Sequence, residues 1–239
     1  MNNFQKSLAR LKDAIQKTGL EVAPNDIEIK PGETVSPTET GCPCCGGGDQ
    51  ASIPCFVCLV RAIQEVETGG EPVVGGVPGC NSCGDGGRSC GPHQIGRPYI
   101  IDACSACPEY CAQFGGPAGV IGKIMSPCPQ TPGESVEECC RLKVIIGEHL
   151  IGCYNKKYGE NPSFSCRCKN KDASGKECCS CEEIAKRHQG GLNGPCSDTP
   201  RRREYWRRVK EKMSKNCPQC ANCGSNPGTN ELPSLEVKR

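Results

Sequence analysis

Apolar side chains recur at helical spacing in the stretch that follows Cys55. The stripe consists of Phe56, Leu59, Val60 and Ile63. At about 100° per residue these positions share one face of a helix. Thr68-Gly69-Gly70 interrupts the pattern, so we predict a helix of about three turns that ends there.

The pattern changes twice more along the chain. Residues 72–91 are dense in glycine and predict short hairpin strands with tight turns, and Tyr99-Ile100-Ile101 is a β-prone run. Helical spacing then returns beyond Cys104. The predicted helices are Val136–Cys153, Cys181–His188 and Glu204–Met213. This order predicts an α+β fold that is mostly helical, with a short β-hairpin region.

The two ends of the chain read as extensions of the main domain. Hydrophobic residues at 4-3-4 spacing near the start predict an amphipathic helix, which a Cys-, Pro- and Gly-rich stretch follows up to residue 50. Cys217, Cys220 and Cys223 lie in a polar tail from residue 214 onward, which we expect to be flexible. We therefore assign 1–50 and 214–239 as Cys-containing extensions and 51–213 as the main domain.

Cysteine is the residue type that changes this picture most. The 239 residues include 24 Cys, 30 Gly and 20 Pro but only 4% aromatic residues, so the apolar core must be thin. Disulfides, each worth about 2–4 kcal/mol, would compensate in an oxidising compartment. Four CxxC pairs leave zinc binding open as the alternative, because two such pairs make a four-thiolate site. These pairs are Cys55/Cys58, Cys80/Cys83, Cys104/Cys107 and Cys217/Cys220.

Charge and hydropathy exclude two classes of partner. The formal net charge is +2, which does not suggest a nucleic-acid partner, and no apolar run approaches the roughly 20 residues of a membrane span. Many disulfides would indicate a secreted protein. The amphipathic start is unlike a secretory signal peptide, however, so three explanations stay open: a missing or altered native start, unconventional export, or cysteines that are not disulfide-bonded.

Two carboxylates are candidates for chemistry. Glu67 lies eleven residues after Phe56, about three full turns, and so falls on the apolar stripe, whereas Glu65 falls on the opposite face. A less hydrated carboxyl favours its protonated form, which a general acid needs. Asp85 lies in the glycine-rich turn Gly84–Gly87. A glycosidase needs two carboxyl groups on either side of the scissile bond, and Asp85 could supply the second.

Two separated blocks of the sequence resemble the invertebrate-type lysozymes, also called the destabilase family. The first block includes Cys55-Phe56-Val57-Cys58, Glu65-Val66-Glu67-Thr68-Gly69-Gly70, Ser89-Cys90-Gly91-Pro92-His93-Gln94-Ile95 and Pro98-Tyr99-Ile100-Ile101-Asp102. The second includes Ala185-Lys186-Arg187-His188-Gln189-Gly190-Gly191, Gly194-Pro195-Cys196 and Tyr205-Trp206. Both occur in the family's order, and together they cover roughly residues 53–213.

The resemblance implies a small disulfide-rich lysozyme-like domain that hydrolyses the β-1,4 bond between N-acetylmuramic acid and N-acetylglucosamine in bacterial peptidoglycan. It implies Glu67 as the general acid and Asp85 as the second catalytic carboxylate. Ser89, Gln94, Tyr99 and His188 are the expected substrate-binding residues. No cofactor and no metal ion are implied, and no oligomeric state follows.

The sequence departs from the family at several positions. Gln64 and Gly70-Glu71 stand where the family usually has cysteines, and Asp85 is one residue closer to Cys90 than the family's aspartate. Other readings therefore stay open: a non-catalytic protein that binds cell walls, a zinc module, or a minor isopeptidase activity through Ser89 and His188. His188 also precedes Gly190-Gly191 at a predicted helix end, where an imidazolium would suit the helix dipole.

Overall fold

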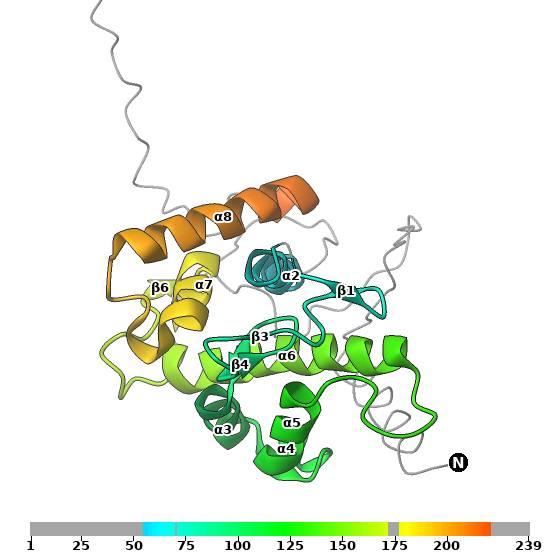
Figure 1. The fold of residues 1–239 in the computed structure, drawn as a ribbon. Helices are drawn as coiled ribbons and strands as arrows, with labels where there is room; N and C mark the ends of the chain where they lie inside the picture. Colours follow the sequence, from blue (N-terminus) through cyan, green and yellow to red (C-terminus); the bar gives the residue numbers. More distant parts are fainter. Residues whose placement is uncertain (1–54, 70, 172–176, 221–239) are drawn as a thin grey trace, which may run out of the picture.

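The computed structural model describes residues 55–69, 71–171 and 177–220. The helix expected at the start of the chain, Cys42, Cys44, Cys45 and Cys223 lie outside the described residues. The helices are α2 (Cys55–Glu67), α3 (Arg97–Ala106), α4 (Pro108–Ala112), α5 (Gly116–Met125), α6 (Val136–Gly159), α7 (Cys181–Gly190) and α8 (Pro200–Asn216), with 3-10 turns at Gly191–Asn193 and Pro218–Cys220 (Figure 1). The described part is thus mostly helical, as the sequence predicts.

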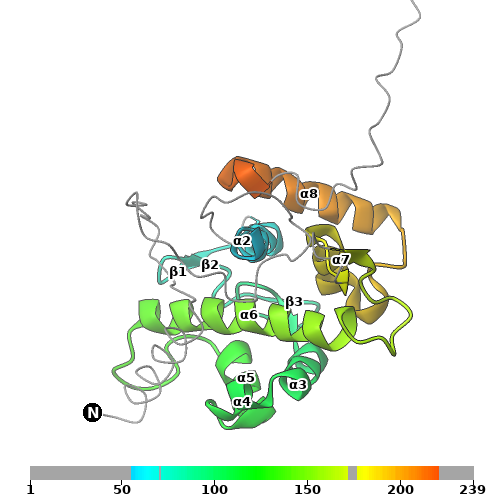
Figure 2. The same cartoon turned by 180° about the vertical axis from the view of Figure 1, so that it is seen from behind.

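Helix α6 organises the packing. Its 24 residues run across the molecule between α2 and α8 on one side and α3, α4 and α5 on the other, and the reverse view gives the same arrangement (Figures 1 and 2). Ser135 caps its first turn by accepting a hydrogen bond from the Glu138 amide. Buried side chains such as Ile146, Leu150 and Ile151 join α6 to the core. Among the described helices none is both long and apolar enough to cross a membrane.

Short antiparallel strands form the β part. They are β1 (Val73–Val74), β2 (Val77–Pro78), β3 (Cys83–Gly84), β4 (Ser89–Cys90), β5 (Ile95–Gly96), β6 (Asn170–Lys171) and β7 (Glu177–Cys178). Strands β1 and β2 pair, β6 and β7 pair, and β3, β4 and β5 form a three-stranded sheet in sequence order. In that sheet Cys83 lies opposite Cys90, and Cys90 lies opposite Ile95. The hairpin strands predicted for residues 72–91 are therefore present.

Most predicted helices agree with the structure, and one predicted element is wrong. Helix α2 ends at Glu67, directly before the Thr-Gly-Gly interruption, while α6 and α8 extend beyond the predicted ends at Cys153 and Met213. Tyr99-Ile100-Ile101 is not extended but lies inside α3. The physical reason is Pro98, which occupies the first turn of α3, where a missing amide is tolerated and the fixed φ suits a helix.

Nine disulfides join the described residues, and several of their cysteines lie within the apolar core. Cys55–Cys220 and Cys58–Cys217 fasten the 3-10 turn after α8 to the first turn of α2. Cys107–Cys153 holds α6 near α4. The others are Cys80–Cys140, Cys83–Cys90, Cys104–Cys111, Cys128–Cys139, Cys166–Cys196 and Cys168–Cys179. Cys181, buried in the first turn of α7, is a free thiol.

Candidate functional site

The two glutamates at the end of α2 point in different directions, as the helical phase predicts. The side chain of Glu67 is 21% exposed, against 42% for that of Glu65. Glu65 faces α8, where it forms an ion pair with Lys212 at 3.2 Å and accepts a hydrogen bond from Asn216. Glu67 is therefore the more shielded acid and Glu65 is tied to a neighbouring helix at the surface.

Tyr205 of α8 makes the closest polar contact of Glu67. Its hydroxyl donates a hydrogen bond of 2.7 Å to Oε1 of Glu67, across a sequence separation of 138 residues. Tyr205 is buried, and this burial, followed by the nearby Glu67 charge, raises the pKa of the phenol well above its ordinary value. The phenol therefore keeps its proton over the whole physiological pH range and acts as a donor to the carboxylate.

His188 of α7 lies beside the same oxygen atom. Its Nε2 is 3.7 Å from Oε1 of Glu67 and 3.0 Å from the backbone carbonyl oxygen of His93. A carbonyl only accepts, so Nε2 carries the hydrogen and donates it to His93. Burial lowers the pKa of His188 against the opposing effect of Glu67, so the ring is neutral. This direction disfavours the imidazolium expected at the helix end, because desolvation of a side chain that is 4% exposed outweighs the Glu67 charge and the hydrogen bond to His93.

His93 continues this chain of contacts into the core. It lies in the turn between β4 and β5, and burial, with His188 next, lowers its pKa to about 3. The backbone of Val60 in α2 opposes this shift but is outweighed. Gly147 of α6 packs against the ring so closely that an added Cβ would overlap Nδ1 of His93. A glycine in α6 is thus required for His93, and through it for His188, to occupy this position.

Arg208 closes the end of α2. Its Nη2 donates a hydrogen bond of 3.3 Å to the carbonyl oxygen of Val66, one residue before Glu67. The last turn of α2 carries no basic residue of its own, so α8 supplies the cation that the negative end of a helix favours. Tyr205 and Arg208, one turn apart on α8, together fix the end of α2.

Asp85 has a different environment. It lies in the turn between β3 and β4, is exposed, and has a backbone φ of 51°, in the left-handed region that aspartate tolerates better than most residues. Its carboxylate accepts a hydrogen bond of 3.5 Å from the Ser89 hydroxyl. The disulfide between Cys83 and Cys90 closes the base of this hairpin. No hydrogen bond or ion pair between described residues joins Asp85 to Glu67.

Gln94 fastens the hairpin to its surroundings. Its Oε1 accepts from the Gly84 amide at 2.8 Å, and its Nε2 donates to the carbonyl oxygens of Gly91 at 2.9 Å and Ser82 at 3.3 Å. The side chain expected to bind substrate is thus occupied by backbone groups. Ser82 in turn donates to the carboxylate of Glu71 at 2.8 Å, which joins the hairpin to the segment that follows α2. This contact lies where the family usually has a cysteine.

Tyr99, the remaining expected binding residue, packs into the aromatic part of the core. Its ring stacks on Tyr154 with 3.8 Å between the centroids, and its edge lies against His188 at 5.6 Å. Ser89 is engaged with Asp85, and neither nitrogen of His188 bonds to it. The Ser89 and His188 pair of the isopeptidase reading is therefore not joined in the described structure.

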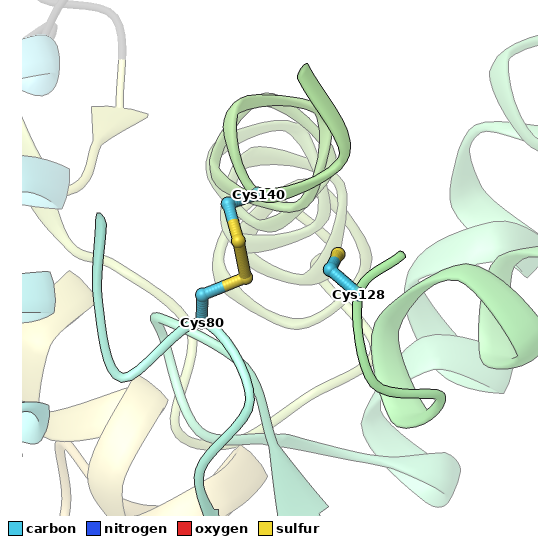
Figure 3. A group of neighbouring side chains, drawn as sticks. All are labelled: Cys80, Cys128 and Cys140. Carbon is cyan, nitrogen blue, oxygen red and sulfur yellow. A yellow bond between two sulfur atoms is a disulfide. The ribbon is translucent and has the colours of Figure 1, made fainter. Parts of the chain in front are cut away.

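The disulfide partners of the CxxC cysteines argue against the zinc alternative. All eight cysteines of the CxxC pairs are bonded to partners outside their own pair. The three sulfur atoms that come within 4.8 Å of one another belong to Cys80, Cys128 and Cys140 (Figure 3). Cys80 and Cys140 are bonded to each other and Cys128 to Cys139. Such sulfurs are disulfide sulfurs and offer no thiolate ligand.

The structure thus brings together site residues that the sequence analysis proposed separately, and it adds two further residues to the site. Glu67 and His188 were candidates; Tyr205 and His93 were noted only as parts of motifs, and their contacts depend on tertiary packing. Comparisons of the chain with protein-family models, with curated proteins and with solved structures found no match. The function is therefore inferred from the site and from the sequence motifs.

Proposed function

We propose that this protein is a lysozyme of the invertebrate type, a secreted glycoside hydrolase that cleaves the β-1,4 bond between N-acetylmuramic acid and N-acetylglucosamine in bacterial peptidoglycan. The disulfide-rich α+β architecture supports the lysozyme-like fold of this proposal. The nine disulfides also support an oxidising compartment such as the cell exterior.

One observation carries the proposal. Glu67 comes from the first block of the family resemblance, and Tyr205 and His188 come from the second, more than a hundred residues later. These three side chains meet at a single carboxylate oxygen, Oε1 of Glu67. Motifs that are separated in sequence and resemble one family would not need to meet at an acid if their similarity were accidental.

The chemistry assigned to Glu67 is proton transfer. In its protonated form it donates a proton to the glycosidic oxygen as the bond from that oxygen to the anomeric carbon breaks. Asp85, as a carboxylate, stabilises or attacks the positive anomeric carbon. Water then adds to that carbon while Glu67 takes the water proton, so one water is consumed and two sugar hydroxyl-bearing products form. Neutral His188 does not compete with Glu67 for this role, because its Nε2 hydrogen is directed to His93.

A non-catalytic protein that binds cell walls is the second candidate. The environment of Asp85 favours it: the side chain is exposed, and Ser89 is its hydrogen-bond partner among the described residues. Nothing in those contacts directs the carboxylate toward Glu67. Such a protein would bind peptidoglycan without lowering its turbidity.

The deciding experiment compares the wild-type chain with Glu67→Gln in turbidity and binding assays on purified bacterial walls. The amide keeps the shape and loses the transferable proton, so lysis should fall by at least about 100-fold while the fold and wall binding persist. Glu65→Gln is the matched control on the same helix, and its lysis should stay within about twofold of wild type. Binding without lysis by the wild-type chain would establish the second candidate, and lysis by a folded Glu67→Gln would refute the acid assignment.

A further inference from the structure

We propose that Tyr205 is a positioning residue that sets the proton affinity of Glu67 and selects which of its two oxygens transfers the proton. This inference rests on the proposed function. Its physical basis is the 2.7 Å hydrogen bond from a buried phenol to Oε1 of Glu67.

The direction of the hydrogen bond follows from the chemistry of the pair. The phenol stays protonated because burial and the adjacent Glu67 charge both raise the pKa of Tyr205. An ionised Glu67 can only accept. The hydrogen bond from Tyr205 therefore stabilises the ionised form of Glu67 more than the protonated form.

The geometry also distinguishes the two carboxylate oxygens. Oε1 receives the Tyr205 hydroxyl and has Nε2 of His188 beside it at 3.7 Å. Oε2 has no such partner among the described residues. An oxygen that already accepts a hydrogen bond binds a proton less well than a free one, so Glu67 is protonated on Oε2. That oxygen is therefore the one that gives the proton to the substrate. Tyr205 thereby acts through Glu67 without contacting the reacting bond.

Other charged groups near the end of α2 act on Glu67 less directly. Arg208 of α8 donates its hydrogen bond to the carbonyl oxygen of Val66 and not to the Glu67 carboxylate. Glu65, on the same helix, is paired with a lysine of α8 on the opposite face. On α6 the buried acid is Glu148, which interacts with Arg61, six positions before Glu67 in α2. None of these groups donates a hydrogen bond to Glu67.

The groups on α7 and on the hairpin complete the surroundings. His188 and His93 both have lowered pKa values because they are buried, so neither ring brings a positive charge to Glu67 at neutral pH. Glu71 is exposed and accepts a hydrogen bond from Ser82. The Tyr205 hydroxyl is thus the single hydrogen-bond donor to Glu67 among the described residues. Its removal should therefore raise the proton affinity of Glu67.

The test is a ¹³C NMR titration of the full chain labelled at the glutamate side-chain carboxyl carbons, with the Glu67 signal assigned by its loss in Glu67→Gln. In Tyr205→Phe the titration midpoint of Glu67 should rise by about one pH unit, a tenfold increase in proton affinity. Tyr158→Phe, which removes a phenol hydroxyl on α6 without touching Glu67, should leave that midpoint unchanged. An unchanged midpoint in a folded Tyr205→Phe variant would overturn the proposal.

The activity readout separates this proposal from the proposed function. If the wild-type chain lyses walls, the alkaline limb of the pH–rate profile should move upward by the same amount in Tyr205→Phe, an effect that general loosening of the fold would not produce. If it does not lyse walls, the function fails but the NMR titration still decides the role of Tyr205. Should Tyr205→Phe not fold, the hydroxyl proton signal of Tyr205 in the wild-type chain should follow the Glu67 titration, and a signal independent of it would refute the proposal.

Discussion

The two acid-bearing regions of this protein are built by opposite means. Glu67 is shielded and held by side chains from α7 and α8, which are remote in sequence but close in the fold. Asp85 sits on a local hairpin whose strands are two residues long and whose closing disulfide spans a sequence separation of seven. The first region needs nearly the whole described chain to form, whereas the second needs about a dozen consecutive residues.

This difference teaches what each region can contribute. A carboxyl that several elements shield can have its proton affinity adjusted by burial, by a hydrogen bond and by neighbouring charges. An exposed carboxylate in a glycine-rich turn stays solvated and ionised, and its useful property is negative charge. The proposed function assigns these two properties to the acid and to the second carboxylate of a retaining glycosidase.

Glu148 is a buried acid for which no described residue is a hydrogen-bond partner, so it serves as the reference for Glu67, and it carries the largest expected effect on stability. Burial raises the pKa of Glu148 to about 7 from an unfolded value of 4.5, with Arg61 opposing the shift. A raised carboxyl pKa means that stability is fully present below about pH 4.5 and is lost as pH rises through 7. The stability of Glu148→Gln relative to wild type should therefore increase by about 3 kcal/mol as the pH rises from 5 to 8.

Urea unfolding at both pH values measures this gain, and the difference between variant and wild type cancels the titration of the buried histidines. Equal differences at pH 5 and pH 8 would mean that Glu148 finds a partner or reaches water. Glu148 would then no longer serve as the buried acid without a partner with which Glu67 is compared.

Gly147→Ala should disturb the surroundings of Glu67 indirectly, through His93 and His188. The new Cβ would overlap Nδ1 of His93, whose carbonyl oxygen holds His188 beside Glu67. Overpacking of this kind should destabilise the protein by about 1–3 kcal/mol and lower wall lysis. The matched control is Gly152→Ala in the same helix, where the Cβ would meet Phe56 at an ordinary 3.5 Å.

Gly152→Ala should be neutral or stabilising by up to about 1 kcal/mol, because alanine favours the helix. Thermal unfolding of the two variants gives the comparison directly. If both variants have the same Tm, the close contact between α6 and His93 does not constrain the site.

Asp85→Asn tests the local region and has the smallest expected effect on folding. Asparagine tolerates the left-handed backbone at least as well as aspartate, so stability should stay within about 0.5 kcal/mol of wild type. The lost charge should lower turnover by roughly tenfold or more with little change in wall binding, since that charge acts mainly in the transition state. Turnover equal to wild type would leave Glu67 as the single catalytic carboxyl.

Sequence alone predicts much of this molecule where the signal is local. The stripe from Phe56 to Ile63 predicts α2 and the phase of Glu67 against Glu65, and glycine density predicts the hairpin region. Tyr99-Ile100-Ile101 misleads because β-branched side chains favour a strand, whereas Pro98 starts a helix and Ile100 is buried in the core. The lowered pKa of His188 also has no local signal, since its desolvation depends on packing against distant elements.

The partners of Cys55 and Cys58 and the hydrogen bond from Tyr205 to Glu67 carry no local signal. Each depends on which face of α8 meets α2, and spacing along one chain does not determine that. Conversely, the engagement of Gln94 with three backbone groups shows that a polar side chain in a recognisable motif can serve the hairpin instead of a ligand.

The two bonds that join α2 to the end of α8 have a consequence for biosynthesis. Cys55 and Cys58 find their partners 165 and 159 residues later, in the last described turn. A ribosome therefore makes Glu67 long before it makes Tyr205, and the growing chain carries its acid without the phenol that completes the site. A nascent or prematurely terminated chain therefore lacks the contacts of Glu67 with α7 and α8 and the two disulfides that hold α2 to the end of α8.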